Sequence, residues 1–156
     1  MDDYRDAIAS CCRQLRLSAN LADNAFAIEG ETHQEYLYNL LSEEIKCRKA
    51  ARIGKLINSA GFPVQHNFAA FQPDEVQFPS GVTPESLKAL EFFHAGNNLV
   101  MYGSTGTGKT MLSICIGMEA CRRGIPVKFF RTASLINQLS EAQERGSLAQ
   151  LHKKLD

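Results

Sequence analysis

Residues 103–110 constrain the possible fold and function of this chain more than any other segment. They read Gly-Ser-Thr-Gly-Thr-Gly-Lys-Thr and match the pattern G-x-x-x-x-G-K-[ST] at every fixed position. Glycines let successive backbone N–H groups approach a phosphate closely, and a helix that starts at the end of such a loop adds further unpaired N–H groups. The pattern therefore predicts a phosphate-binding loop made of Gly103, Ser104, Thr105, Gly106, Thr107, Gly108, Lys109 and Thr110.

The last two residues of this loop predict the ligand. A lysine at position 109 can reach the β- and γ-phosphates of a nucleoside triphosphate, and the hydroxyl of Thr110 can ligate Mg²⁺. We therefore expect ATP with Mg²⁺ as cofactors. The chain has no G-x-S-x-G elbow of an α/β-hydrolase. The dinucleotide pattern G-x-G-x-x-G fails because position 111, after Gly106 and Gly108, is Met111.

The segments around the loop alternate in hydrophobic period. Short apolar runs at 99–102 and 127–130 are typical of buried strands, whereas residues 109–123 and 133–144 have helical patterns, and a short helical piece closes the chain. Strand–helix–strand–helix order is typical of a parallel sheet. The sequence thus predicts an α/β fold, a parallel sheet of the P-loop NTPase type truncated after two strands, preceded by an all-helical arm.

That arm is predicted to span residues 1–61. A helix over 1–17 and a loop over 18–31 come first. Thr32 can then cap a long helix, with Glu35 as its capping-box partner, that runs to about Ala60 and stops at Gly61. Residues 62–82 follow as an aromatic, proline-containing connector, and residues 83–156 form the ATP-binding part, with a helix starting at Thr83 and ending near residues 95–96.

The connector is too aromatic to lie free in solvent, so we expect it to pack across the ATP-binding part. Its Phe68 and Phe71 are candidates to lie near the adenine base, and plain core packing is the alternative.

The second half of the long helix is basic. Formal net charge is zero, so a case for nucleic acid rests on local patches. A basic stripe can neutralise DNA phosphates, and three of these cations share a helical face by spacing. The alternative is that they match the helix macrodipole, because acidic residues occupy the first half. The candidate DNA contacts are Lys46, Arg48, Lys49, Arg52 and Lys55.

Cysteine usage and hydropathy indicate where the protein acts. The five cysteines include no CxxC pair and no zinc spacing, which favours reduced thiols, and Cys115 and Cys121 lie in an apolar helical stretch as small core residues. There is no apolar run of membrane-spanning length and no signal-peptide pattern at the N-terminus. We therefore expect a cytoplasmic protein with no membrane partner.

Beyond the generic loop, several segments resemble one family. Residues 97–103 read Asn-Asn-Leu-Val-Met-Tyr-Gly, and similar matches occur at 119–121, 124–129, 132–139 and in the helical arm from 15 to 63. These segments resemble the IstB-like ATP-binding proteins, which help transposases of bacterial insertion sequences and are AAA+ relatives of DnaC-type helicase loaders. The resemblance implies a P-loop ATPase that regulates DNA transposition, with DNA and a transposase as partners and a homo-oligomeric full-length form.

The resemblance also implies a departure. In that family the next element is a strand ending in the Walker B acids, and no such apolar run ending in Asp-Glu follows Thr110. We expect an N-terminal portion, from a natural truncation or a cloned fragment, that binds ATP with little hydrolysis; catalytic residues are unassigned. Two alternatives stay open: a DnaC-type loader acting with a replicative helicase, and a P-loop NTPase or kinase that does not act on DNA.

Overall fold

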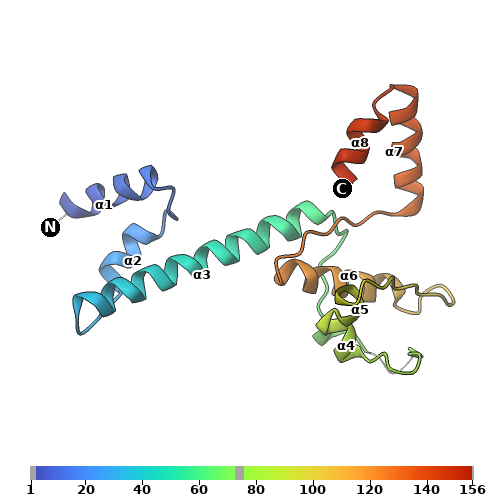
Figure 1. Ribbon diagram of the computed structural model, residues 1–156, viewed down its shortest axis with the longest axis horizontal. Coiled ribbons are helices and arrows are strands. Elements are labelled where there is room, and N and C mark those ends of the chain that lie inside the picture. Colours follow the sequence, from blue (N-terminus) through green and yellow to red (C-terminus); the bar gives the residue numbers. More distant parts are fainter. Residues whose placement is uncertain (1–2, 73–75, 156) are drawn as a thin grey trace. The chain divides into compact units, whose positions relative to one another are not determined.

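The computed structural model describes residues 3–72 and 76–155, and the chain divides into two compact units, Met1–Gly54 and Lys55–Asp156 (Figure 1). Residues 1–2 of the first expected helix, residues 73–75 of the connector and residue 156 lie outside the described residues. The helices are α1 (Asp3–Gln14), α2 (Leu21–Ala27), α3 (His33–Ala60), the 3-10 turn η1 (Phe68–Ala70), α4 (Pro84–Ala89), α5 (Glu91–His94), α6 (Lys109–Arg122), α7 (Thr132–Glu144) and α8 (Leu148–Leu155).

The α/β prediction is wrong, since no strand and no sheet occurs among residues 3–72 and 76–155. Segments 99–102 and 127–130, expected as strands, are irregular. The first keeps a period of two, because Leu99 and Met101 pack on the core while Val100 and Tyr102 are exposed. A strand forms only through hydrogen bonds to a neighbouring strand, and within the described residues neither segment pairs with one. In the second segment, Phe129 N–H instead donates to Ala60 C=O at 2.7 Å.

In the first unit, the long helix begins where its capping signals predict. The Thr32 hydroxyl accepts from Glu35 N–H at 3.1 Å, and the Glu35 carboxylate accepts from Glu31 N–H at 2.9 Å. The helix has 28 residues and ends at Ala60, followed by Gly61 at φ 76°. One helix was missed: residues 18–31 were expected as a loop, yet α2 forms there and buries Leu21 and Ala22.

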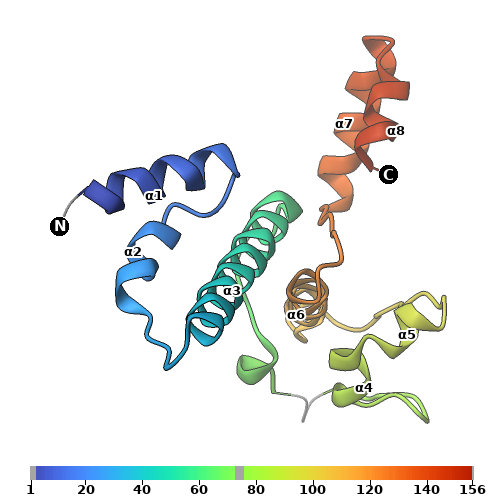
Figure 2. The ribbon, with the colours of Figure 1, turned by 60° about the vertical axis from the view of Figure 1, so that its left-hand side comes forward.

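The second unit is built around the apolar helix α6. Its Leu112, Cys115, Ile116 and Ala120 form a core with Phe71 of the connector and with Leu87 and Leu90 of the α4–α5 region. Figure 2 shows α6 nearly end-on with α4 beside it. Described connector residues also pack on this core, namely Phe68, Val76, Phe78 and Val82. The expectation that the connector lies across the ATP-binding part is confirmed.

Helices α4 and α5 replace the single helix expected from Thr83. The start is as predicted, since Thr83 and Ser86 form a reciprocal capping box. The break comes at Leu90, a buried residue in the left-handed region at φ 60°. Arg123 at the end of α6 donates to the carbonyl oxygens of Ala89 and Lys88, at 3.0 and 2.9 Å, and so closes the last turn of α4.

The cysteines are free thiols, as expected. Cys115 and Cys121 are fully buried in α6, and burial raises the pKa of both thiols, which keeps them protonated. None of the helices described between residues 3 and 155 is long and apolar enough to cross a membrane.

Candidate phosphate-binding loop

The loop between Tyr102 and α6 has the backbone that its glycines were expected to allow. Gly103, Gly106 and Gly108 have φ values of 143°, 87° and 77°, a region that residues with a side chain rarely adopt. Space does not explain these glycines: a Cβ on Gly106 would meet nothing within 4 Å, and one on Gly103 or Gly108 would make ordinary contacts at 3.6 and 3.8 Å. Conformation is therefore what requires glycine here.

Helix α6 starts directly from this loop. Gly108 is its N-cap and offers no side-chain cap, and the first intrahelical donor is Leu112 N–H, which binds Gly108 C=O at 2.9 Å. The N–H groups of residues 109–111 precede that donor, so they have no intrahelical acceptor. A 14-residue helix with such a start favours an anion at its N-terminus.

Lys109 is held by the loop itself. Its ammonium group donates to the carbonyl oxygens of Gly103 and Ser104 at 2.9 and 2.6 Å, and lies 3.3 Å from the Thr107 hydroxyl oxygen. The Thr107 hydroxyl in turn donates to the Ser104 carbonyl at 3.0 Å. The positive charge thus lies over the loop, between its first residues and the helix start. Thr110, the second helical residue, is exposed.

Phe71 supports this loop from the connector. It is buried in the core, and its ring edge lies within contact distance of the Gly108 position. Phe71 lies in the core and Phe68 packs against it, which agrees with the core-packing alternative. A place near the adenine base stays a prediction for both residues. The contact of Phe71 with the loop is a role that the sequence did not reveal.

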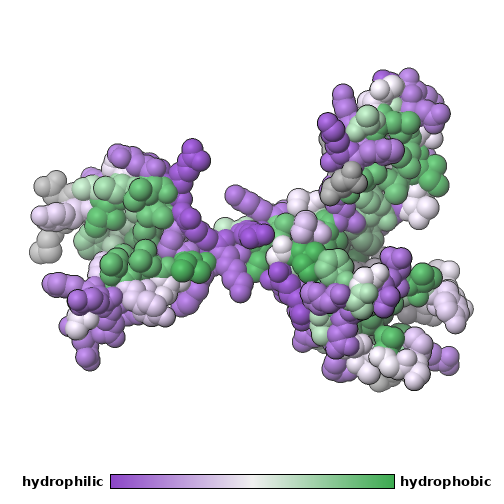
Figure 3. All heavy atoms as spheres, viewed as in Figure 1, coloured by the Kyte–Doolittle hydropathy of each residue, from purple (hydrophilic) through white to green (hydrophobic). Residues whose placement is uncertain are grey.

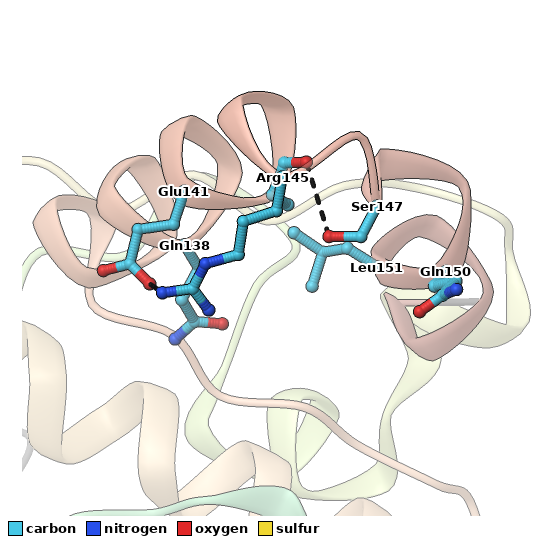
Figure 4. A pocket seen from close by; sticks show the side chains of 7 residues that line it. Gln138, Glu141, Arg145, Ser147, Gln150 and Leu151 are labelled. Atoms are coloured by element: carbon cyan, nitrogen blue, oxygen red, sulfur yellow. Dashed lines mark hydrogen bonds and ion pairs between the residues drawn. The ribbon is translucent and has the colours of Figure 1, made fainter.

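Residues 103–107 and 110 of the loop are exposed, and two cavities in the described residues lie away from it. A cavity of ≈ 180 Å³ lies between α7 and α8, where Arg145 pairs with Glu141 at its rim (Figure 4). A second of ≈ 300 Å³ is lined by residues that follow α3, by the 129–131 segment and by α7. The loop is an open surface feature.

The five candidate DNA-contact cations fall into two groups, those with a carboxylate partner and those without one in the described residues. Lys46 pairs with Glu43 at 3.0 Å, and Arg48 pairs with Glu44 at 2.7 Å while also donating to the Arg16 carbonyl. The other three, Lys49, Arg52 and Lys55, are exposed, and within residues 3–72 and 76–155 none has a carboxylate partner at ion-pair distance.

Arg48 belongs to a structural network centred on Glu44, which the sequence did not single out. Glu44 is only 4% exposed, and its carboxylate accepts from Ser18 N–H at 2.9 Å, from the Ser18 hydroxyl and from Arg48. Burial alone would raise the pKa of this carboxyl, but the Ser18 and Arg48 hydrogen bonds outweigh it and hold the pKa below its ordinary value. The network ties the segment after α1 to α3.

A glycine-dependent loop, an uncapped helix and a lysine at the first helical position agree with the class that the sequence predicts, the phosphate-loop nucleotide-binding proteins. The comparisons with known proteins narrow this class. The chain matches the family model described as IstB-like ATP binding protein over residues 14–155, and it belongs to that family.

Individual relatives agree with the family match. The chain is 32% identical, over 92% of its length, to a protein described as ATP-binding in insertion sequence IS5376 of Geobacillus stearothermophilus. It is 29% identical, over 86% of its length, to one described as ATP-binding in an insertion sequence of Mycobacterium tuberculosis. It spans 59% and 55% of those two relatives' own lengths.

Proposed function

We propose that this chain binds ATP with Mg²⁺ through residues 103–110 and serves as the ATP-binding part of a helper protein for DNA transposition. The N–H groups of the loop and of residues 109–111 would surround the phosphates. Lys109 would pair with the β- and γ-phosphate oxygens, and the Thr110 hydroxyl would ligate Mg²⁺.

The position of Lys109 carries this proposal. Its ammonium group already lies over the loop, held only by carbonyl oxygens and a hydroxyl. A phosphate carries a full negative charge, so it is a better acceptor for that ammonium than the neutral carbonyls. ATP binding would thus exchange weaker contacts for stronger ones at a site whose backbone is already arranged.

Calorimetric titration of ATP-Mg²⁺ tests the proposal. Lys109→Ala should abolish measurable binding without unfolding the chain, because Lys109 lies at the surface loop and is no part of the core. Lys128→Ala removes the same charge from an exposed position in the same unit and is the matched control. Equal affinities for wild type and Lys109→Ala would refute the proposal.

The role in transposition is supported by the family and by relatives that are described as insertion-sequence proteins. We propose a transposase and DNA as partners, in the cytoplasm. Capture experiments with an insertion-sequence transposase and with a replicative helicase distinguish the two partner classes. Binding of the transposase in the presence of ATP is the expected result, and binding of the helicase alone would indicate a loader instead.

For DNA, we propose Arg52 and Lys55 as the first contacts, together with Lys49. They are exposed and, within the described residues, lack carboxylate partners, whereas Lys46 and Arg48 are already paired on their own helix. Contacts of this kind go to phosphates, so binding should lack sequence preference and weaken steeply with salt.

A further inference from the structure

The Lys109 ammonium group is held over its loop by uncharged acceptors. Within residues 3–72 and 76–155 it has no carboxylate partner at ion-pair distance, and residues 103–108 and 110 carry no charged side chain. Figure 3 shows pale atoms, of intermediate hydropathy, at the right-hand end of the second unit, where the loop lies. The place of this cation therefore depends on hydrogen bonds to neutral oxygens.

Thr107 reaches across the loop towards its first residues. It lies between Gly106 and Gly108, which both have positive φ, whereas Thr107 itself does not. Its hydroxyl donates to Ser104 C=O at 3.0 Å, and its oxygen lies 3.6 Å from the place of a Cβ on Gly103. The side chain between the two glycines is thus directed back to the start of the loop. Because a β-branched residue is stiff at χ1, the hydroxyl has few other positions.

The Thr107 hydroxyl has two partners at once. Its hydrogen is used on the Ser104 carbonyl, so its oxygen is left to accept from the Lys109 ammonium group at 3.3 Å. This contact is longer than those of the same ammonium group with the Ser104 and Gly103 carbonyls, at 2.6 and 2.9 Å. Of the three acceptors that the described residues give Lys109, the Thr107 oxygen is the one from a side chain, so a substitution can remove it.

We propose that Thr107 is a positioning residue of the phosphate-binding loop, whose hydroxyl holds the Lys109 ammonium group where it meets the phosphates of ATP. The use of this position rests on the proposed function, but the contact itself can be measured without nucleotide. The competing explanation is a local turn, in which a threonine hydroxyl bonds a nearby carbonyl and stabilises the backbone alone. In that case Lys109 would not respond to the loss of the hydroxyl.

The position of the ammonium group is tested in the full 156-residue chain without nucleotide. An ammonium group whose hydrogens are taken up by acceptors reacts slowly with amine reagents. Thr107→Val removes the hydroxyl and keeps the shape, so trace acetylation of Lys109, measured by mass spectrometry against the exposed Lys128, should rise about two- to tenfold. Thr107→Ser keeps the hydroxyl and should restore the slow reaction, which a general loosening of the loop would not explain.

The use of this position is tested by calorimetric titration of ATP-Mg²⁺ into the same variants. Thr107→Val should weaken the affinity about three- to tenfold, and Thr107→Ser should recover most of it. Thr132→Val is the matched control, since Thr132 is an exposed threonine of the same unit outside the loop. Circular dichroism checks that the helices persist in each variant.

Equal acetylation of Lys109 in wild type and Thr107→Val would overturn the proposal, because the hydroxyl would then stabilise a turn alone. Equal ATP affinity of these two chains would overturn it as well, since the position would then make no difference to binding. If Thr107→Ser behaves as Thr107→Val does, the methyl group and not the hydroxyl is responsible, and the proposal fails. A wild-type chain that binds no ATP while its acetylation responds as expected would refute the proposed function and not the contact between Thr107 and Lys109.

Discussion

Removing the Glu44 carboxylate should destabilise the first unit far more than removing its neighbour. Glu44→Ala deletes an acceptor that receives Ser18 N–H at 2.9 Å, the Ser18 hydroxyl and Arg48 Nε at 2.7 Å. Breaking a buried ion pair costs about 3–5 kcal/mol, and hydrogen bonds to a charged group contribute about 1.5–3 kcal/mol each. The Arg48 side chain is 53% exposed and can be rehydrated. We therefore expect a loss of about 2–3 kcal/mol.

Urea unfolding followed by far-ultraviolet circular dichroism measures this loss, read on the transition of the first unit. Glu43→Ala is the control, because Glu43 pairs only with the exposed Lys46 on the same helix. A pair of that kind contributes below about 1 kcal/mol. If the two variants unfold at the same urea concentration, the network does not hold the segment after α1 to α3.

The loss of folding stability at acid pH tests the role of the Glu44 carboxyl in a second way. Burial raises the pKa of Glu44, but the hydrogen bonds from Ser18 and Arg48 lower it more, so the folded-state pKa lies below the ordinary value of 4.5. A carboxyl with a depressed folded pKa stabilises the fold above its unfolded pKa, and this stability is lost as pH falls through the folded pKa. Wild type should therefore lose more stability than Glu44→Ala below pH 4.5. Parallel acid profiles would contradict the reasoning.

Four further outcomes are expected. Gly106→Ala should weaken ATP binding by about 1–2 kcal/mol in calorimetry, because an alanine resists a positive φ although nothing blocks its Cβ; unchanged affinity would mean that the loop changes conformation on binding. Arg123→Ala should lower stability by about 1–3 kcal/mol in thermal unfolding through the loss of its bonds to the α4 carbonyls, and an unchanged midpoint would show that those bonds are dispensable. Arg52→Gln with Lys55→Gln should flatten the slope of log DNA affinity against log salt by about 2 units, and a constant slope would place the DNA contact elsewhere. The chain should release phosphate from ATP far more slowly than a full-length relative, because the loop offers a lysine and one Mg²⁺ ligand but no carboxylate to orient water; equal turnover that depends on Lys109 would show a catalytic acid within these residues.

Local signals explain which parts of the fold were predictable. The ends of α3 and the start of α4 are set by Thr32, Gly61 and Thr83, whose caps involve residues only a few positions away. The prediction of a sheet failed because an apolar run becomes a strand only when a distant segment supplies its hydrogen bonds, and local sequence does not show whether one does. The break between α4 and α5 at Leu90 was also not predictable, because a buried leucine in the left-handed region depends on the core around it.

In the candidate sites, too, the features set by local sequence were predictable and those set by distant contacts were not. The positive φ values of Gly103, Gly106 and Gly108 agree with a pattern that encodes backbone conformation directly in glycine. The basic part of α3 was harder to interpret. Glu44 and Arg48 are four residues apart, which is visible in the sequence, but the burial of Glu44 under Ser18 depends on a segment 26 residues away. Charge counting alone could not tell this paired arginine from Arg52, which has no carboxylate partner at ion-pair distance in the described residues.

The Glu44 network also sets how much positive charge α3 presents to solvent. With Glu44 ionised, Arg48 is paired, whereas Lys49, Arg52 and Lys55 have no carboxylate partner at ion-pair distance in the described residues. Protonation of Glu44 below its depressed pKa would release Arg48 and add its charge to those three cations. One buried carboxyl therefore couples the stability of the first unit to the electrostatic field along its long helix.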